Sequence, residues 1–115
     1  MPVTLYGIAN CDTVKRARAW LTEQGHEASF HDFRKASVPL DRLDAWIAAF
    51  GWERLLNRQG TTWRRLDEPT RAGVTDAASA RALMLAQPSV IKRPVVDWGT
   101  QITVGFDEKS WSERL

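Results

Sequence analysis

The stretch that decides the fold is TLYGIANCDTVKRA, residues 4–17. Its apolar beginning ends at Gly7 and a helical pattern starts just after Cys11, so we predict a strand, a short loop and a helix. This order places the thiol at or just before a helix N-terminus, where free backbone N–H groups and the helix dipole favour negative charge. A thiol in that place has a lowered pKa and a larger fraction of thiolate, which is the reactive form.

Two cations follow this cysteine closely. Lys15 and Arg16 lie within about the next helical turn and would lower the pKa of the Cys11 thiol further. The alternative is that Cys11 is a small buried filler, which is a common place for a free cysteine. The position at a helix start favours the reactive thiol, and the filler remains open.

Length and charge set the first limits on function. The 115 residues suit one domain over residues 1–115, and no repeat, linker or low-complexity tract divides them. The net charge is only +2, which makes no case for nucleic-acid binding by itself. The cluster Trp63, Arg64 and Arg65 lacks repeated aromatics, so we interpret it as a packed Trp beside solvated charges. We therefore expect no nucleic-acid partner.

The single cysteine and the short apolar runs limit which metal sites, membrane contacts and cellular compartments we expect. One cysteine excludes an internal disulfide framework and a Cys-rich metal site, and His26 and His31 lie away from carboxylate clusters, so we predict no metal. No apolar run approaches the roughly 20 residues of a membrane span, and no signal-peptide pattern precedes the first strand. We expect a cytoplasmic monomer with no membrane contact.

The first third of the chain predicts a strand–helix–strand unit. Residues 2–7 read as a buried strand, residues 11–24 as a helix that Gly25 ends, and residues 26–33 as a second strand. The apolar face of the helix holds Val14, Ala17, Trp20 and Leu21. This order fits a right-handed parallel βαβ unit.

The middle of the chain reads as a helical insertion over residues 38–87. A loop at residues 34–39 leads into it. The predicted helices span residues 39–50, 52–57, 63–67 and 75–87. We expect Pro69 to interrupt the third of them and Pro88 to end the last.

The end of the chain returns to a sheet pattern. Val95–Trp98 and Ile102–Val104 predict a β-hairpin, and Asp107 caps a last helix. The order βαβ, helices, ββα is that of an α/β thioredoxin-like fold, a mixed four-stranded sheet with a helical insertion.

Three motifs carry a family resemblance. They are YGIANCDT at residues 6–13, LLNRQG at 55–60 and KRPVV at 92–96. In this order they resemble the active-site loop, the middle arginine loop and the Arg-Pro step of the arsenate reductase/Spx (ArsC-like) family. Residues 11–13, 60–63 and 104–106 look most like its YffB-like branch. The resemblance covers nearly the whole chain and implies a thioredoxin-like fold and a cytoplasmic protein.

The chain departs from the family pattern at three places. Val14 stands where Spx regulators carry the second cysteine of Cys-x-x-Cys, so an internal redox switch is impossible. Val104, with Gln101 three residues earlier, stands where arsenate reductases bring a third arginine. The middle-loop arginine is displaced by about one residue, to Arg58 after Asn57.

The resemblance implies that Cys11 is catalytic and that Arg93 and Pro94, just before the predicted hairpin, contribute to its site. It implies that Pro94 is cis, that the Arg93–Pro94 backbone pairs with an extended peptide such as glutathione, and that Arg93 lies close to the thiol. Without the resemblance, Arg93 reads as an exposed cation between a loop and a strand.

Three more residues are candidates for substrate binding, each with a plainer alternative. The Arg58 loop could fold back over the Cys11 helix and bind a carboxylate, or Arg58 is a solvated loop charge. Lys15 could bind a glutathione carboxylate or cover the helix surface. Asn10 could shape the loop and offer a donor, or cap the helix.

The resemblance implies a glutathione-dependent thiol reductase of monothiol type. Because no second cysteine is available, the resolving thiol comes from outside, and glutathione is the expected co-substrate, with no bound cofactor. A glutaredoxin or a thiolated protein substrate is a further expected partner. The alternatives are an arsenate reductase, which the missing third arginine disfavours, and a non-catalytic Spx-like adaptor that binds a protein such as RNA polymerase.

Overall fold

The computed structural model describes residues 3–115, so Pro2, in the predicted strand at 2–7, lies outside the described residues. Contacts divide the chain into two units. One joins residues 3–36 to residues 93–115, and the other is Ser37–Lys92. The second unit corresponds to the predicted insertion at residues 38–87 and continues a few residues further.

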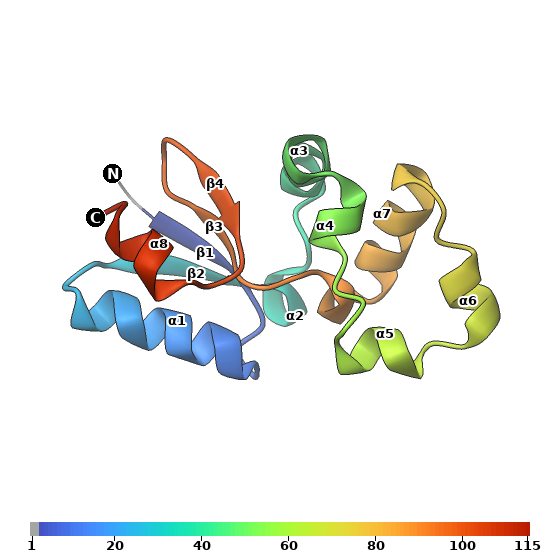
Figure 1. Ribbon diagram of the computed structural model, residues 1–115, viewed down its shortest axis with the longest axis horizontal. Helices are drawn as coiled ribbons and strands as arrows, with labels where there is room; N and C mark the ends of the chain where they lie inside the picture. The colour runs from blue at the N-terminus through green and yellow to red at the C-terminus, as the bar shows by residue number, and fades with distance from the viewer. Residues whose placement is uncertain (1–2) are drawn as a thin grey trace. The chain divides into compact units, whose positions relative to one another are not determined.

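The first unit contains a four-stranded mixed sheet in the order β2-β1-β3-β4. Its elements are β1 (Val3–Gly7), α1 (Asp12–Glu23), β2 (Ala28–Asp32), α2 (Phe33–Ala36), β3 (Val95–Asp97), β4 (Ile102–Val104) and α8 (Glu108–Ser112). β1 pairs in parallel with β2 and antiparallel with β3, and β3 pairs antiparallel with β4 (Figure 1). The predicted thioredoxin-like α/β fold is confirmed.

Aromatic side chains dominate the core of this unit. Trp111 of α8 contacts Trp98, Trp20 and Phe106 edge-on, with ring centroids 5.0, 5.8 and 4.7 Å away. The Trp98 indole N–H donates to the Thr103 hydroxyl at 2.9 Å, so its one polar group is satisfied. The same cluster includes the apolar faces of α1, β1 and β3, which places α1 and α8 against one face of the sheet.

Gly7 allows α1 to approach the end of β1. Val14 is fully buried, and a Cβ built on Gly7 would lie 2.9 Å from its Cγ2. Such a contact is too short for real atoms, and the β-branched Val14 has little rotamer freedom with which to yield. The absence of a side chain at Gly7 therefore sets how α1 sits on the sheet.

A short helix corrects the loop predicted at residues 34–39. α2 begins directly after β2, where the Asp32 carboxylate accepts the Arg34 backbone N–H at 2.9 Å. Four residues are too few to show a helical period, so the sequence pattern gave no signal for it.

The second unit is helical throughout. Its elements are α3 (Leu40–Phe50), α4 (Trp52–Leu55), α5 (Thr61–Arg65), α6 (Glu68–Ala72), α7 (Ala77–Ala86) and the 3-10 turn η1 (Pro88–Val90). An antiparallel bridge joins Leu56 to Ile91, and the Lys92 N–H donates to the Leu55 carbonyl at 2.8 Å. Trp63 is half-buried and its neighbours Arg64 and Arg65 are exposed, as predicted.

Pro69 starts a helix rather than interrupting one. α5 ends at Arg65, before the predicted boundary, and α6 contains Pro69 in its first turn. The Asp67 carboxylate caps α6 by accepting the Thr70 N–H at 2.8 Å. Proline is tolerated in a first turn because the N–H that it lacks has no helical partner there, so the prediction at this position was wrong.

We expect Gly7→Ala to destabilise the fold by about 1–3 kcal/mol, the usual cost of forcing an extra methyl group into a packed site. The measurement is urea unfolding followed by tryptophan fluorescence. Gly73→Ala is the matched control, because a Cβ there meets no heavy atom closer than 3.4 Å. Equal stability of the two variants would contradict the role given to Gly7.

Candidate active site

Cys11 lies where the loop after β1 meets α1. Its backbone is extended (φ −142°, ψ 124°), it is the N-cap residue of the helix, and its carbonyl accepts the Lys15 N–H at 2.9 Å. Its side chain is half-buried and packs against the core of the sheet unit. The predicted thiol at a helix start is confirmed. Asn10 is exposed and does not cap the helix, so that alternative was wrong.

The surroundings of Cys11 lower the pKa of its thiol. Burial alone raises that pKa by taking the thiolate out of water, but three other groups outweigh it. They are the backbone N–H of Val14, the guanidinium of Arg93 and the backbone N–H of Thr13. The two N–H groups lower this pKa as hydrogen-bond donors to the sulfur.

Arg93 reaches the thiol from a distant part of the chain. Its guanidinium acts on Cys11 both as a hydrogen-bond donor and as a charge, and the side chain is half-buried. The Arg93–Pro94 peptide bond is cis, as the resemblance implies. The Pro94 carbonyl accepts the Gly105 N–H at 2.8 Å, which ties this step to the turn after β4. Cys11 and Arg93 are thus brought together, and Pro94 directly follows Arg93 in the chain.

A family model described as the ArsC family matches residues 6–114. The chain belongs to the ArsC family. A solved structure titled YFFB (PA3664) protein is 46% identical, covers 96% of each chain and superposes with a TM-score of 0.89. An arsenate reductase (ArsC) related protein from Brucella melitensis is 49% identical over 98% of this chain and 93% of that one, with a TM-score of 0.78. The global transcriptional regulator Spx of Streptococcus pyogenes is 28% identical, over 92% of this chain and 79% of that protein.

In this ArsC-family chain the neighbouring cations of α1 do not act on the thiol as predicted. Lys15 and Arg16 are both exposed, and neither is among the groups that lower the pKa of Cys11. Arg93 supplies the full charge instead. A cation that follows in sequence can point along the outside of a helix, whereas Arg93 is positioned by the sheet.

Arg58 lies in the Ser37–Lys92 unit, exposed in the turn after α4. Its guanidinium lies 5.5 Å from the centre of the Trp52 ring, a cation–π arrangement. Asn57 shapes this turn, because its side-chain oxygen accepts the Gln59 N–H at 3.2 Å. Arg58 is therefore a partly ordered surface cation, held over an aromatic ring.

The strand that could bring a third arginine carries no charge. Val104 is half-buried in β4 and pairs with Val95 of β3. Gln101 lies before the strand, and its side-chain oxygen accepts a hydrogen bond from the Arg114 guanidinium. The folded sheet therefore has the uncharged Val104 at the position where the resemblance places the third arginine.

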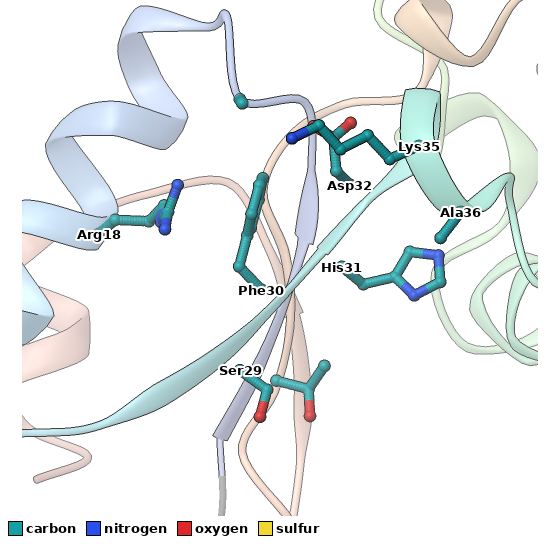
Figure 2. Close-up of a pocket in the computed structure, with 9 residues that line it drawn as sticks. Arg18, Ser29, Phe30, His31, Asp32, Lys35 and Ala36 are labelled. Carbon is teal, nitrogen blue, oxygen red and sulfur yellow. The ribbon is translucent and has the colours of Figure 1, made fainter.

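A cavity of about 520 Å³ lies beside β2 and was not predicted from the sequence. Arg18, Phe30, Asp32 and Lys35 line it together with Ala9 of the loop before Cys11 (Figure 2). These residues come from α1, β2 and α2, so only the folded chain places them together. The alternation predicted for β2 assigns Phe30 and His31 to opposite faces and gave no signal for a cavity that both residues line.

The described residues hold neither a metal-binding cluster nor a helix that could cross a membrane. Within residues 3–115, no group of three or more His, Cys, Asp or Glu side chains is arranged to hold a metal ion. None of the helices formed by these residues has the length and apolar character that a membrane crossing needs.

We expect the Cys11 thiol to react with iodoacetamide with a pH midpoint below about 8.5, the value of a free cysteine. Since the folded-state pKa is lowered, the reactive thiolate persists to lower pH than in the same chain unfolded in urea. A folded-state midpoint at or above the urea value would show that the helix start does not activate the thiol.

Arg93→Ala should move that midpoint upward, because the donor and the neighbouring charge that stabilise the thiolate are lost. Lys15→Ala is the matched control and should leave the midpoint unchanged. If Lys15→Ala moves the midpoint more than Arg93→Ala does, the assignment of the activating cation is wrong.

Proposed function

We propose that this ArsC-family chain is a glutathione-dependent monothiol oxidoreductase. The observation that carries the proposal is a half-buried Cys11, with a lowered thiol pKa, at a helix start beside Arg93. No second cysteine exists in the sequence, so a thiol from outside must complete each turnover. Glutathione, the abundant thiol of a reducing compartment, fits that role, and we place the protein in the cytoplasm accordingly.

The first step exchanges one S–S bond for another. The Cys11 thiolate attacks the glutathione sulfur of a mixed disulfide R–S–SG, forming Cys11–S–SG and releasing R–S⁻, which takes a proton from water. A second glutathione, as its thiolate, attacks the glutathione sulfur held on Cys11. This step forms GSSG and returns the Cys11 thiolate. The net reaction is R–SSG plus GSH giving R–SH plus GSSG.

A lowered pKa of Cys11 helps both steps. It increases the fraction of attacking thiolate at neutral pH, and it makes the Cys11 sulfur a better leaving group in the second step. The guanidinium of Arg93 compensates the charge on Cys11 each time the thiolate is present. Arg93 therefore acts on the reacting sulfur itself.

Glutathione recognition would use the backbone before Pro94 and several cations. Pro94 has no N–H, and its carbonyl already accepts the Gly105 N–H. An extended peptide would therefore pair with the backbone of Arg93 rather than with that of Pro94. Lys15 and Arg58 are exposed cations, and each is a candidate by itself for binding a glutathione carboxylate. Asn10 is an exposed donor directly before Cys11 in the chain. A glutaredoxin or a glutathionylated protein would be the natural disulfide-bearing partner.

Arsenate reduction is a second candidate, which the relative from Brucella melitensis titled as arsenate reductase related makes worth testing. A tetrahedral oxyanion needs several donors, and each missing charged hydrogen bond costs about 1.5–3 kcal/mol. That cost corresponds to roughly 10- to 150-fold in binding or rate. Since β4 supplies no arginine, we expect arsenate to be a poorer substrate than a glutathione mixed disulfide.

An adaptor role is the third candidate, motivated by the relative named as the transcriptional regulator Spx. Val14 occupies the place of a second cysteine, so redox control by an internal disulfide is excluded for this chain. Binding to a protein such as RNA polymerase would need no reactive thiol.

Purified protein should turn over a glutathione mixed disulfide in the presence of glutathione, while arsenate is reduced at least about 10-fold more slowly. The assay couples GSSG formation to glutathione reductase for both substrates. Cys11→Ser should abolish turnover of the mixed disulfide. Efficient arsenate turnover with an untouched mixed disulfide would replace the proposal by arsenate reduction, and inertness of both substrates would favour the adaptor.

Arg58→Ala should raise the KM for glutathione by roughly 10-fold, which is the lower end of the effect of losing one charged hydrogen bond of about 1.5–3 kcal/mol. Arg54→Ala is the matched control, because Arg54 lies over the Phe50 ring at 5.6 Å in the same unit. An equal effect of the two substitutions would assign Arg58 a surface role only.

A further inference from the structure

The cavity beside β2 joins an aromatic ring to two cations. The Arg18 guanidinium lies 4.2 Å from the centre of the Phe30 ring. Figure 2 shows Lys35 extending from α2 across the end of β2 toward the side on which Phe30 and Arg18 lie, while His31 points to the other side. The cavity therefore has an apolar wall between two positive groups.

The charge of this cavity selects an anion. Arg18 and Lys35 are exposed, and within residues 3–115 neither forms an ion pair with a carboxylate. The one acidic group of the lining, Asp32, is 9% exposed and accepts the Arg34 backbone N–H. The cavity thus offers a ligand two accessible positive charges, while its one negative charge is buried and hydrogen-bonded.

The adjacent strand is an open edge of the sheet. Among the strands of residues 3–115, β2 pairs only with β1, and its first residues, Ala28 and Ser29, are exposed. Natural edge strands are commonly protected by lysine, proline or a bulge. The sequence of β2, ASFHD, contains neither lysine nor proline. An unprotected edge can accept an extended segment of another chain by strand addition.

One residue of the cavity lining lies close to the reacting thiol in the sequence. Ala9 lines the cavity and precedes Cys11 by two residues, a span of at most about 7 Å at 3.3–3.6 Å per residue. An extended peptide whose modified cysteine reaches Cys11 would place side chains about two to four residues away at the cavity.

We propose that the β2 edge and this cavity dock an acidic, extended segment of the protein whose mixed disulfide Cys11 reduces. The inference rests on the proposed thiol-reductase function and names its substrate class. The acidic side chains pair with Arg18 and Lys35, the Phe30 ring contacts their apolar parts, and the backbone of the segment adds to β2.

The test compares glutathionylated peptides of one length that share a single cysteine. They carry Glu, Gln or Lys at the positions two to four residues on either side of it. For the wild-type protein, kcat/KM for the Glu peptide should exceed that for the Lys peptide by about 10-fold at low ionic strength and by much less in 0.5 M salt. Arg18→Glu and Lys35→Glu should each bring this ratio to about 1 or below, whereas Lys109→Glu, an equal charge change on α8, should preserve it.

The outcomes separate this inference from the proposed function. If a small glutathione mixed disulfide is turned over but the Glu and Lys peptides react equally, docking is wrong and the thiol-reductase proposal stands. If no mixed disulfide reacts, the proposed function fails, and direct binding decides the docking question.

Direct binding uses Cys11→Ser and a cysteine-free Glu peptide, followed by amide chemical shifts in NMR. Docking predicts shifts concentrated in residues 28–35, absent with the Lys peptide and lost in Arg18→Glu. Inorganic phosphate is titrated separately. Shifts produced by phosphate and not by the Glu peptide would assign a small-anion site and overturn the docking of a protein segment.

Discussion

The close approach of α1 to the end of β1 is the contact on which the sheet unit depends. Gly7 leaves the space that the buried Val14 fills, and this fixes where the helix begins relative to the strand. Because the helix begins at Cys11, the same contact fixes the backbone N–H groups of Thr13 and Val14 around the sulfur. A packing constraint between two apolar positions thus determines the electrostatics of a thiol.

The charge on that thiol is balanced by two kinds of group. The N–H groups of α1 are partial charges that come with the helix and cannot be removed by substituting a side chain. Arg93 is a full charge on a side chain and can be replaced. A site built in this way keeps the part of the thiolate stabilisation that the backbone supplies when the cation is lost.

Much of the fold was predictable from the sequence, and the reasons for the exceptions are physical. The βαβ and ββα parts and the position of Cys11 follow from local periodicity, and Arg93 and Pro94 followed only from the family resemblance. α2 and α6 were missed because helices of four or five residues show no full period, and Pro69 marks a helix start as readily as a break. The meeting of Arg18, Phe30 and Lys35 could not be predicted, because it depends on how three elements pack.

Arg93 has a backbone anchor on either side of it in the chain. Lys92, the residue before it, is anchored by its N–H to the Leu55 carbonyl in the helical unit, and Pro94, the residue after it, is anchored to Gly105 in the sheet unit. The activating cation is therefore the residue at which the chain passes from the helical unit back into the sheet unit. The cation beside Cys11 thus belongs to no helix or strand, and its backbone is held by a hydrogen bond of the residue on either side of it.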